Sequence, residues 1–293
     1  MAENVRVIKD RIGNIGNIRQ ITKAMNAIAM TKVTRMKRRV AAVRPYVEGF
    51  DTLVAEILAQ SIGTGEPRAA DLHAAEPHPL TVDNGSSDVG ILVLNSDRGL
   101  CGRFKGEINR KGEELLLGHD HAAKILAGGE KARAYFARRP VEILKTYTHF
   151  YEDPTPRIAE QISSDLISLY LEGALGRVIL VYMRFVSDLK QRLAVEEFLP
   201  IRVEAKGSDA LIEPNPARML DVVLPLYLQG KIFSALLHTK TSEDAIRRQA
   251  MRNATDNADD LLKTLTRSYN KARQQSITRE ISDIMGGAEA LRD

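Results

Sequence analysis

The sequence has one cysteine and no tryptophan, and these scarcities exclude several kinds of protein. Because Cys101 is the single cysteine among 293 residues, an internal disulfide framework and a multi-thiolate metal site are both excluded. Aromatic residues make up only 5% of the chain, which argues against a surface that stacks bases or sugar rings. No run approaches about 18 consecutive apolar residues, and the N-terminus resembles neither a signal peptide nor a transit peptide. We therefore expect a protein that is made and kept in the cytoplasmic compartment.

The sequence also lacks the motifs of nucleotide-binding and catalytic sites. It has no GxxxxGK[ST] phosphate loop, and the glycines at 128–129 do not have the GxGxxG spacing. The two histidines of residues 119–121 have no third ligand nearby, which is more typical of a polar loop than of a zinc site. No histidine with an orienting carboxylate can be assigned beside Cys101. We expect no catalytic, cofactor-binding or metal site.

One long amphipathic helix is predicted over residues 241–285, a stretch without proline or glycine. Apolar or small residues recur there in steps of three and four, at Ala254, Ala258, Leu261, Leu265, Ser268, Ala272, Ile277, Ile281 and Ile284. This is the spacing of a coiled-coil seam. A helix of this length is far longer than the ~11 residues of an ordinary one and needs a partner.

A second seam runs through residues 3–60 at the other end of the chain. Its members are Thr22, Met25, Ala29, Val33, Met36, Val40, Val43, Val47, Phe50, Val54 and Ile57, preceded by Val5, Ile8, Ile12, Ile15 and Ile18. Two seams at opposite ends of one chain favour an antiparallel two-helix coiled coil with a domain inserted at the turn. Gly13 and Gly16 each weaken the first helix by about 1 kcal/mol, and Pro45 predicts a kink in it but not an end.

Positive charge is concentrated on the first helix. Nine basic residues and no acidic residue lie between Arg11 and Val47. Four of them form what we call the basic stripe, Arg35, Lys37, Arg38 and Arg39. A solvated face is the usual fate of such a run. The alternative is an acidic partner, because nine uncompensated charges repel one another within the ~8–10 Å over which salt leaves them unscreened.

The middle of the chain predicts a doubly wound α/β domain. After a Gly- and Pro-rich loop at 61–88, strands are expected at 89–94, 122–126, 141–146, 177–185 and 192–201, the last as an antiparallel edge. Helices are expected over residues 105–117, 130–139 and 156–173. The fold class is thus α/β plus a long antiparallel two-helix coiled coil. The expected divisions are 1–60, 61–212 and 213–293.

Four motifs resemble one known family from end to end. They are ITKAM at 21–25, SDRGLCG at 96–102, ATDNA at 254–258 and YNKARQQSITREISDI at 269–284. These segments closely resemble the gamma subunit of the F-type ATP synthase, although Arg103, Phe104 and Lys105 replace the residues usual after SDRGLCG, and Pro225 is unusual. No thiol-bearing insertion of the chloroplast type is present, which favours a bacterial enzyme. The resemblance implies a coiled coil with an inserted Rossmann-like domain.

The resemblance also implies a function and partners. The chain would be the rotating central shaft that couples proton flow through the membrane c ring to ATP synthesis or hydrolysis in the alpha/beta hexamer. It would contact the alpha, beta and epsilon subunits and the c ring, and lie peripherally on the cytoplasmic face of the bacterial inner membrane. ATP, ADP and Mg would bind alpha and beta, so this non-catalytic chain would hold no cofactor of its own and no nucleic acid.

Three sets of contact residues are implied by the same resemblance. The basic stripe would pass the acidic helix-turn-helix lever of beta, with Lys23 and Met25 near the same track. A catch loop of alpha and beta would meet Arg273, Gln274, Thr278 and Glu280. A polar rotor foot resting on the c ring would comprise Glu204, Lys206, Asp209 and Glu213.

Two other classes of protein compete with this interpretation. A basic coiled-coil protein that binds nucleic acid would explain the positive charge, but not the small residues Ala254, Ala258 and Ala272 in the second seam. A small α/β enzyme with helical dimerisation arms would require the catalytic site that the sequence lacks. Capture of alpha and beta subunits would favour the shaft, whereas salt-labile nucleic acid would favour the first rival.

Overall fold

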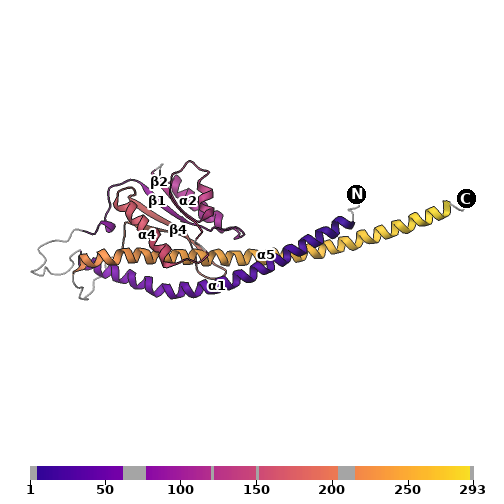
Figure 1. The fold of residues 1–293 in the computed structure, drawn as a ribbon, viewed down its shortest axis with the longest axis horizontal. Coiled ribbons are helices and arrows are strands. Elements are labelled where there is room, and N and C mark those ends of the chain that lie inside the picture. The colour runs from indigo at the N-terminus through magenta and orange to yellow at the C-terminus, as the bar shows by residue number, and fades with distance from the viewer. Residues whose placement is uncertain (1–4, 62–76, 120–121, 150–151, 204–214, 291–293) are drawn as a thin grey trace, which may run out of the picture. The chain divides into compact units, whose positions relative to one another are not determined.

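Two long helices form the ends of the chain and a five-stranded sheet lies between them in sequence (Figure 1). The computed structural model describes residues 5–61, 77–119, 122–149, 152–203 and 215–290. Helix α1 spans Val5–Ser61 and continues through Pro45, and helix α5 spans Pro216–Ala290 and continues through Pro225. The expectation that Pro45 does not end the first helix is confirmed.

The chain divides into two compact units, which we call the tip unit and the α/β unit. The tip unit contains Met1–Met30 and Arg247–Asp293, and the α/β unit contains Thr31–Ile246. Both long helices therefore contribute to both units.

In the tip unit the two helices pair antiparallel through polar contacts in their seam. The Thr255 hydroxyl donates to the Thr22 hydroxyl at 2.8 Å, and Arg19 forms an ion pair with Asp259. A step toward the N-terminus on α1 thus matches a step toward the C-terminus on α5, which confirms the predicted antiparallel coiled coil.

The seam differs from the predicted one at several positions. Ile18 and Leu261 are 48% and 44% exposed, and Ser268 is also exposed. The partly buried places belong instead to Arg19, Leu262 and Tyr269. The apolar spacing selected Ile18 for the seam, but Arg19 occupies the seam and forms an ion pair with Asp259. A pattern of hydrophobic residues does not reveal a charged seam position.

The second seam was also predicted to extend too far. Ile277, Ile281 and Ile284 are 46%, 53% and 71% exposed. The pairing of Thr22 with Thr255 places Val5 opposite about Ala272 when it is continued along an antiparallel pair. Beyond that point α5 has no described residue of α1 beside it, so its apolar stripe faces outward.

The α/β unit is built on a sheet with strand order β3-β2-β1-β4-β5. The strands are β1 Val89–Leu94, β2 Ala123–Gly128, β3 Ile143–Tyr147, β4 Arg177–Phe185 and β5 Gln191–Leu199. The first four are parallel, and β5 pairs antiparallel with β4 as the predicted edge. The helices are α2 Phe104–Leu117, α3 Glu130–Phe136 and α4 Pro156–Leu171, with a short 3-10 helix, η1, at Pro79–Thr81.

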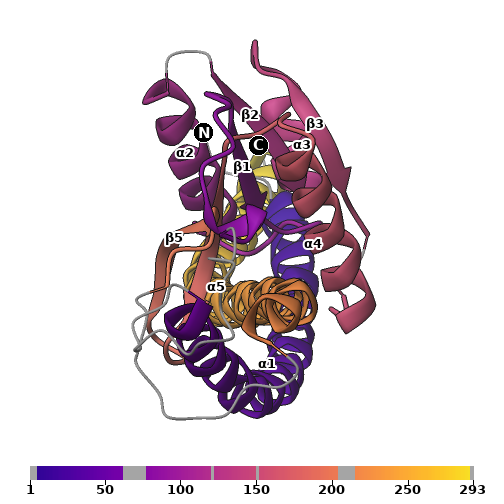
Figure 2. The same cartoon turned by 90° about the vertical axis from the view of Figure 1, so that its left-hand side faces the viewer.

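The two faces of the sheet bury different helices. Side chains of α2 and α3, such as Phe104 and Phe136, pack on one face. On the other face α4 and α5 pack together with the end of α1, through residues such as Tyr170, Leu224 and Ile57. Figure 2 shows α5 lying between the sheet and α1. Part of α5 is apolar enough to cross a membrane by length and composition, but 56% of that window is buried in the chain, as in a core helix.

The pairing in the tip unit can be tested by disulfide trapping. We expect Thr22→Cys/Thr255→Cys, in a Cys101→Ser background, to form a disulfide within one chain, because the two hydroxyl oxygens lie 2.8 Å apart. Non-reducing electrophoresis would show a faster monomer band. The control pair Thr22→Cys/Leu262→Cys is out of register and should remain reduced. Disulfides found only between separate molecules would contradict the intrachain pairing.

Candidate partner-contact surfaces

The basic stripe lies on a part of α1 whose other side is fully buried. Val33 and Met36 are 2% and 0% exposed, whereas Arg35, Lys37 and Arg38 are exposed. Since a helix turns by about 100° per residue, Arg35 and Arg38 point about 130° and about 170° away from the direction midway between Val33 and Met36. The stripe therefore surrounds the outer half of the helix and does not form one line.

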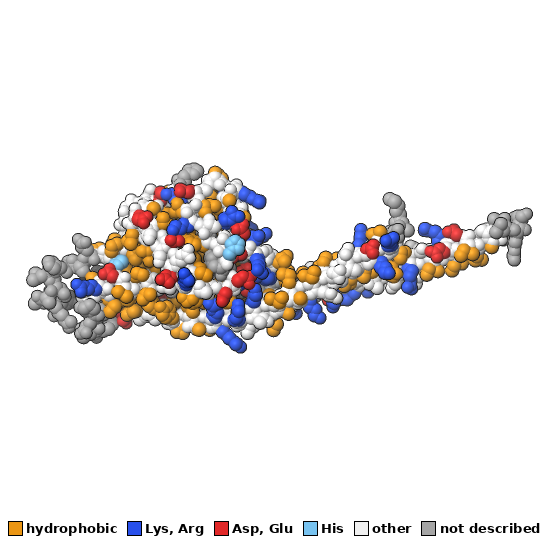
Figure 3. All heavy atoms as spheres, in the orientation of Figure 1, with side chains coloured by type: hydrophobic (Ala, Val, Ile, Leu, Met, Phe, Trp, Pro, Cys, Tyr) orange, Lys and Arg blue, Asp and Glu red, His pale blue; other side chains and the backbone are white. Residues whose placement is uncertain are grey.

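Acidic residues of the α/β unit pair with the flanks of this surface. The Lys32 ammonium lies 2.9 Å from the Glu152 carboxylate, and that of Lys37 lies 3.2 Å from Asp188. Arg39 forms an ion pair with Asp153 and also donates to the carbonyl of Pro154. In Figure 3 blue side chains gather where α1 passes the α/β unit, with red side chains beside them.

The expectation of uncompensated charge on α1 is thus wrong for several residues. Lys32, Lys37 and Arg39 have partners in the α/β unit, and Arg44 pairs with Glu48 one turn along α1 at 2.7 Å. The acids that pair with the first three lie more than 110 positions away in the sequence. No local pattern could have revealed them. In the described part of the chain, Arg35 and Arg38 have no ion pair.

Glu152 is the centre of the acidic side of this contact. It accepts from Lys32 at 2.9 Å and also pairs with Arg98 at 3.1 Å, from the loop after β1. The hydrogen bond from Lys32 holds the pKa of Glu152 below its usual range, with smaller contributions from Lys240 and Arg98. The carboxylate therefore remains charged at neutral pH.

The polar turn of α5 next to this contact is buried and was not anticipated from the sequence. Residues Thr239 to Asp244 are all 3% exposed or less. The Lys240 ammonium lies 3.2 Å from Glu243 and 3.4 Å from Asp244, and the Ser242 hydroxyl donates to the carbonyl of Met183 in β4. Their i, i+3 and i, i+4 spacing was the available signal, but it is equally typical of an exposed helix.

The other expected contact residues lie in the tip unit. Lys23 is exposed and Met25 is partly buried. Arg273, Gln274, Thr278 and Glu280 are all exposed on α5. The Thr278 hydroxyl donates to the carbonyl of Gln274 at 3.0 Å. From Arg273 to Ala288 all side chains but that of partly buried Ser276 are exposed, so this stretch of α5 is open to a partner.

The expected rotor foot cannot be placed. Its four members, Glu204, Lys206, Asp209 and Glu213, lie outside the described residues. The rotor foot therefore stays a prediction.

The loop after β1 is filled by its own side chains. The Asp97 carboxylate accepts the Glu130 backbone N–H at 2.9 Å, at the start of α3, and the Asn95 amide donates to Asn109 at 2.6 Å. Gly129 has a φ of 92°, and a Cβ there would lie 2.5 Å from the carbonyl oxygen of Asn95. The second glycine of the pair at 128–129 thus serves close packing. Among the described residues no group of three or more His, Cys, Asp or Glu could hold a metal.

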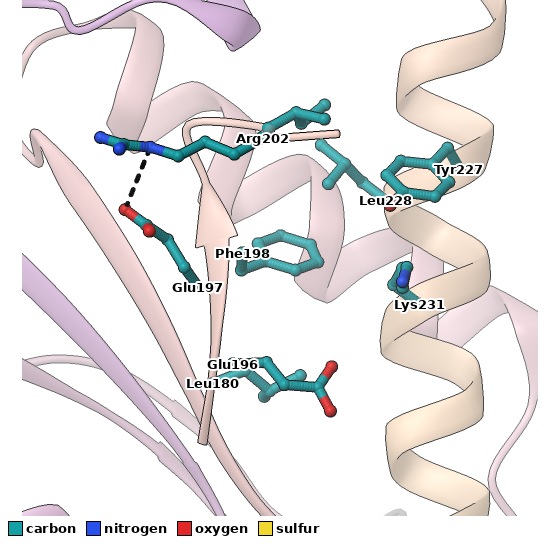
Figure 4. Close-up of a pocket in the computed structure, with 9 residues that line it drawn as sticks. Leu180, Glu196, Glu197, Phe198, Arg202, Tyr227, Leu228 and Lys231 are labelled. Carbon is teal, nitrogen blue, oxygen red and sulfur yellow. Dashed lines mark ion pairs between the residues drawn. The ribbon is translucent and has the colours of Figure 1, made fainter. Parts of the chain in front are cut away.

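A cavity of about 300 Å³ lies between β5 and α5 (Figure 4). Phe198 and Leu228 contribute apolar side chains to it. Its charged side chains already have partners, since Glu197 pairs with Arg177 at 3.0 Å and Lys231 pairs with Asp51 at 2.9 Å. Its charged groups are thus engaged within the chain.

Two antiparallel terminal helices with a doubly wound domain inserted between them in the sequence define an α/β protein with a terminal coiled coil. Comparison with known proteins assigns the chain to a family. The family model described as ATP synthase matches residues 4–291. The ATP synthase gamma chain of Moorella thermoacetica is 36% identical over 292 residues, covering 99% of each chain. That of Mycolicibacterium vanbaalenii is 35% identical over 320 residues, covering 100% of this chain and 99% of the relative. The chain belongs to the ATP synthase gamma chain family.

Solved structures share the fold. A chain of the Euglena gracilis mitochondrial ATP synthase, in a structure of OSCP, F1 and c-ring, aligns with a TM-score of 0.65 at 18% identity, covering 98% of this chain and 94% of that one. A chain from the central stalk and c-ring of the Tetrahymena thermophila enzyme aligns with a TM-score of 0.60 at 23% identity, covering 80% and 99%. Together with the family assignment, these matches support the role of a rotary shaft, and none supports the nucleic-acid alternative.

A buried histidine beside the basic stripe makes stability depend on pH. His238 of α5 accepts the Phe185 backbone N–H at 3.3 Å, and its burial lowers its pKa below the ordinary 6.5, assisted by Arg184. Because the folded pKa lies below the unfolded one, this contribution is complete above about pH 6.5 and is lost as the pH falls below it. We expect the urea midpoint to drop between pH 7.5 and 5.5, and to drop less in His238→Asn, which keeps an acceptor. An equal drop in both proteins would contradict a neutral buried imidazole.

Proposed function

We propose that this chain is the rotating central shaft of a proton-translocating ATP synthase. It would couple proton flow through the c ring to the nucleotide sites of the alpha and beta subunits. The observation that carries the proposal is full-length membership of the gamma chain family together with an antiparallel helix pair whose longer member has an exposed end. The remainder of the chain would serve as an anchoring domain.

The shaft would act by touching identical catalytic subunits differently. A ligand or partner shifts a conformational equilibrium only through a difference in its contacts with the two states. The two helices of the tip unit present different side chains around their circumference, such as Lys23 on α1 and Arg273 on α5. Each rotational position would therefore offer a given beta subunit a different surface.

The size of the required effect limits how the shaft can work. A million-fold change in nucleotide affinity corresponds to about 8 kcal/mol. An exposed ion pair contributes only ~0–1 kcal/mol, so no single charge of the basic stripe could supply this free energy. Many distributed contacts, or steric exclusion by a stiff helix pair, would carry the coupling.

Each part of the chain would contact a different partner. The exposed end of α5, with Arg273, Gln274, Thr278 and Glu280, would contact the alpha/beta hexamer. The basic stripe would pass the acidic lever of beta, and the α/β unit would contact the epsilon subunit. The rotor foot would meet the c ring, so the protein would lie peripherally on the cytoplasmic face of the membrane. This chain would bind neither nucleotide nor magnesium itself.

The contact at the end of α5 can be tested with Arg273→Ala/Gln274→Ala. Both residues are exposed, so we expect the free energy of unfolding to change by less than ~0.5 kcal/mol. Turnover of the assembled enzyme should fall severely, because a planar guanidinium and an amide supply directional donors to a partner loop. Steady-state ATPase and proton-pumping assays measure the effect.

The matched control is Asp260→Ala/Lys263→Ala, which removes an exposed ion pair of 3.0 Å from the paired part of the same helix. It should leave turnover near that of the parent enzyme. Normal turnover and pumping in the fully assembled Arg273/Gln274 variant would refute the assignment of these residues to a stator contact.

The proposed lack of a nucleotide site predicts a calorimetric result. The described chain has no phosphate-binding loop at the ends of its parallel strands, where Asp97 and Asn95 are already engaged. Titration of ATP and magnesium into the isolated full chain should give no binding in the micromolar range. Micromolar binding would overturn the assignment as a non-catalytic subunit.

A further inference from the structure

The basic stripe is heterogeneous in its surroundings, although its sequence suggests a uniform patch. Lys37 and Arg39 pair with acids of the α/β unit, as does Lys32 earlier in the same helix. Arg35 and Arg38 are exposed and have no ion pair among the described residues. Neighbours in the sequence thus have opposite environments.

Helix geometry explains this division. Lys32 and Arg39 are seven residues apart and therefore point within about 20° of each other on one side of the buried line through Val33 and Met36. Lys37 points to the other side of that line. These three side chains flank the buried line, where acidic loops of the α/β unit reach them. Arg35 and Arg38 point to the back of the helix, away from those loops.

The flanking pairs come from two separate loops. Glu152 and Asp153 precede α4, while Asp188 lies in the turn between β4 and β5. Lys37 also lies 5.9 Å from the centre of the Phe185 ring, and Arg39 lies at the same distance from that of Phe233. The α/β unit therefore holds this segment of α1 from both sides.

We propose that the positive surface of α1 is divided between two tasks. Lys32, Lys37 and Arg39 are positioning residues that clamp α1 to acidic loops of the α/β unit. Arg35 and Arg38 form the pair that faces an acidic protein surface, and this second half rests on the proposed function. Lys37 and Arg39 are thereby removed from the expected stator contacts.

The clamp has a mechanical consequence for a shaft. Each pair is partly exposed, with the Lys37 and Asp188 side chains at 46% and 38%, so each one alone is weak. Two loops acting on both sides of one helix restrict its rotation about its own axis, because turning it either way lengthens at least one pair. The outward direction of Arg35 and Arg38 is then fixed by the intrachain acids.

A charge swap tests the clamp in the isolated full chain. Lys37→Asp places like charges together and should lower the urea midpoint, and Lys37→Asp/Asp188→Lys should restore most of the loss. Spin labels at Ala41→Cys and Leu189→Cys, two exposed positions, report the distance between α1 and the turn in a Cys101→Ser background. The distance distribution should broaden in the single variant and narrow again in the swap. Lys37→Arg should behave as the parent protein.

Arg38 supplies the matched control because it adjoins Lys37 but points away from Asp188. Arg38→Asp should leave both the urea midpoint and the distance distribution of the isolated chain unchanged. In the complex with alpha and beta subunits, adding Asp188→Lys should not reverse any effect of Arg38→Asp on association. A swap at Lys37 that fails to restore the midpoint and the distance distribution would overturn the clamp.

The outward pair is tested in the complex with alpha and beta subunits. Arg35→Glu/Arg38→Glu should slow association of the chain with the alpha/beta hexamer by about threefold or more at low salt, and the difference should shrink at high salt. Equal association rates at low salt would overturn this assignment. The swap is measured without partners, so it stands or falls independently of the shaft function. If the parent chain does not assemble with alpha and beta at all, the proposed function itself fails.

Discussion

Burial of the middle of α5 is the constraint on which the α/β unit depends. This helix packs against the sheet through residues such as Leu224 and Leu236, and α1 packs on it in turn. Even its polar turn, Thr239 to Asp244, is enclosed, with Lys240 held by Glu243 and Asp244. An unpaired buried charge would cost several kcal/mol, so these groups fix both the position of α5 and its rotation. The contacts of α1 with the acidic loops depend on that fixed surface.

The seam of the tip unit shows a related use of polar groups. Thr22 with Thr255 and Arg19 with Asp259 occupy positions that an ordinary coiled coil gives to apolar side chains. Apolar side chains tolerate sliding by a turn, whereas hydrogen bonds and ion pairs require one alignment. The register of the two helices is thereby specified at the cost of some apolar burial.

The sequence predicts most of the fold because its strands are short apolar runs and its helices are strongly periodic. Strands β1 and β4 have the predicted limits, and β5 is the antiparallel edge that its alternation indicated. The seam was less predictable, since Leu261 and Leu262 differ only in the direction they face. The contacts of the basic stripe could not be predicted from the sequence, because the partners of Lys32, Lys37 and Arg39 come from loops that are remote in the sequence. Of the expected contact residues, Arg273 and Gln274 are exposed, as a partner contact requires.

The free end of α5 has a consequence for the life of the chain before assembly. Ile277, Ile281, Ile284 and Met285 expose between 46% and 71% of their surface along one stretch of helix. Contiguous apolar surface of this kind promotes aggregation when it is not covered. A cell that makes this chain in excess of its partners would accumulate unassembled chains that aggregate or are degraded. The exposed apolar residues near the end of α5 therefore require that the subunits be synthesised in balanced amounts.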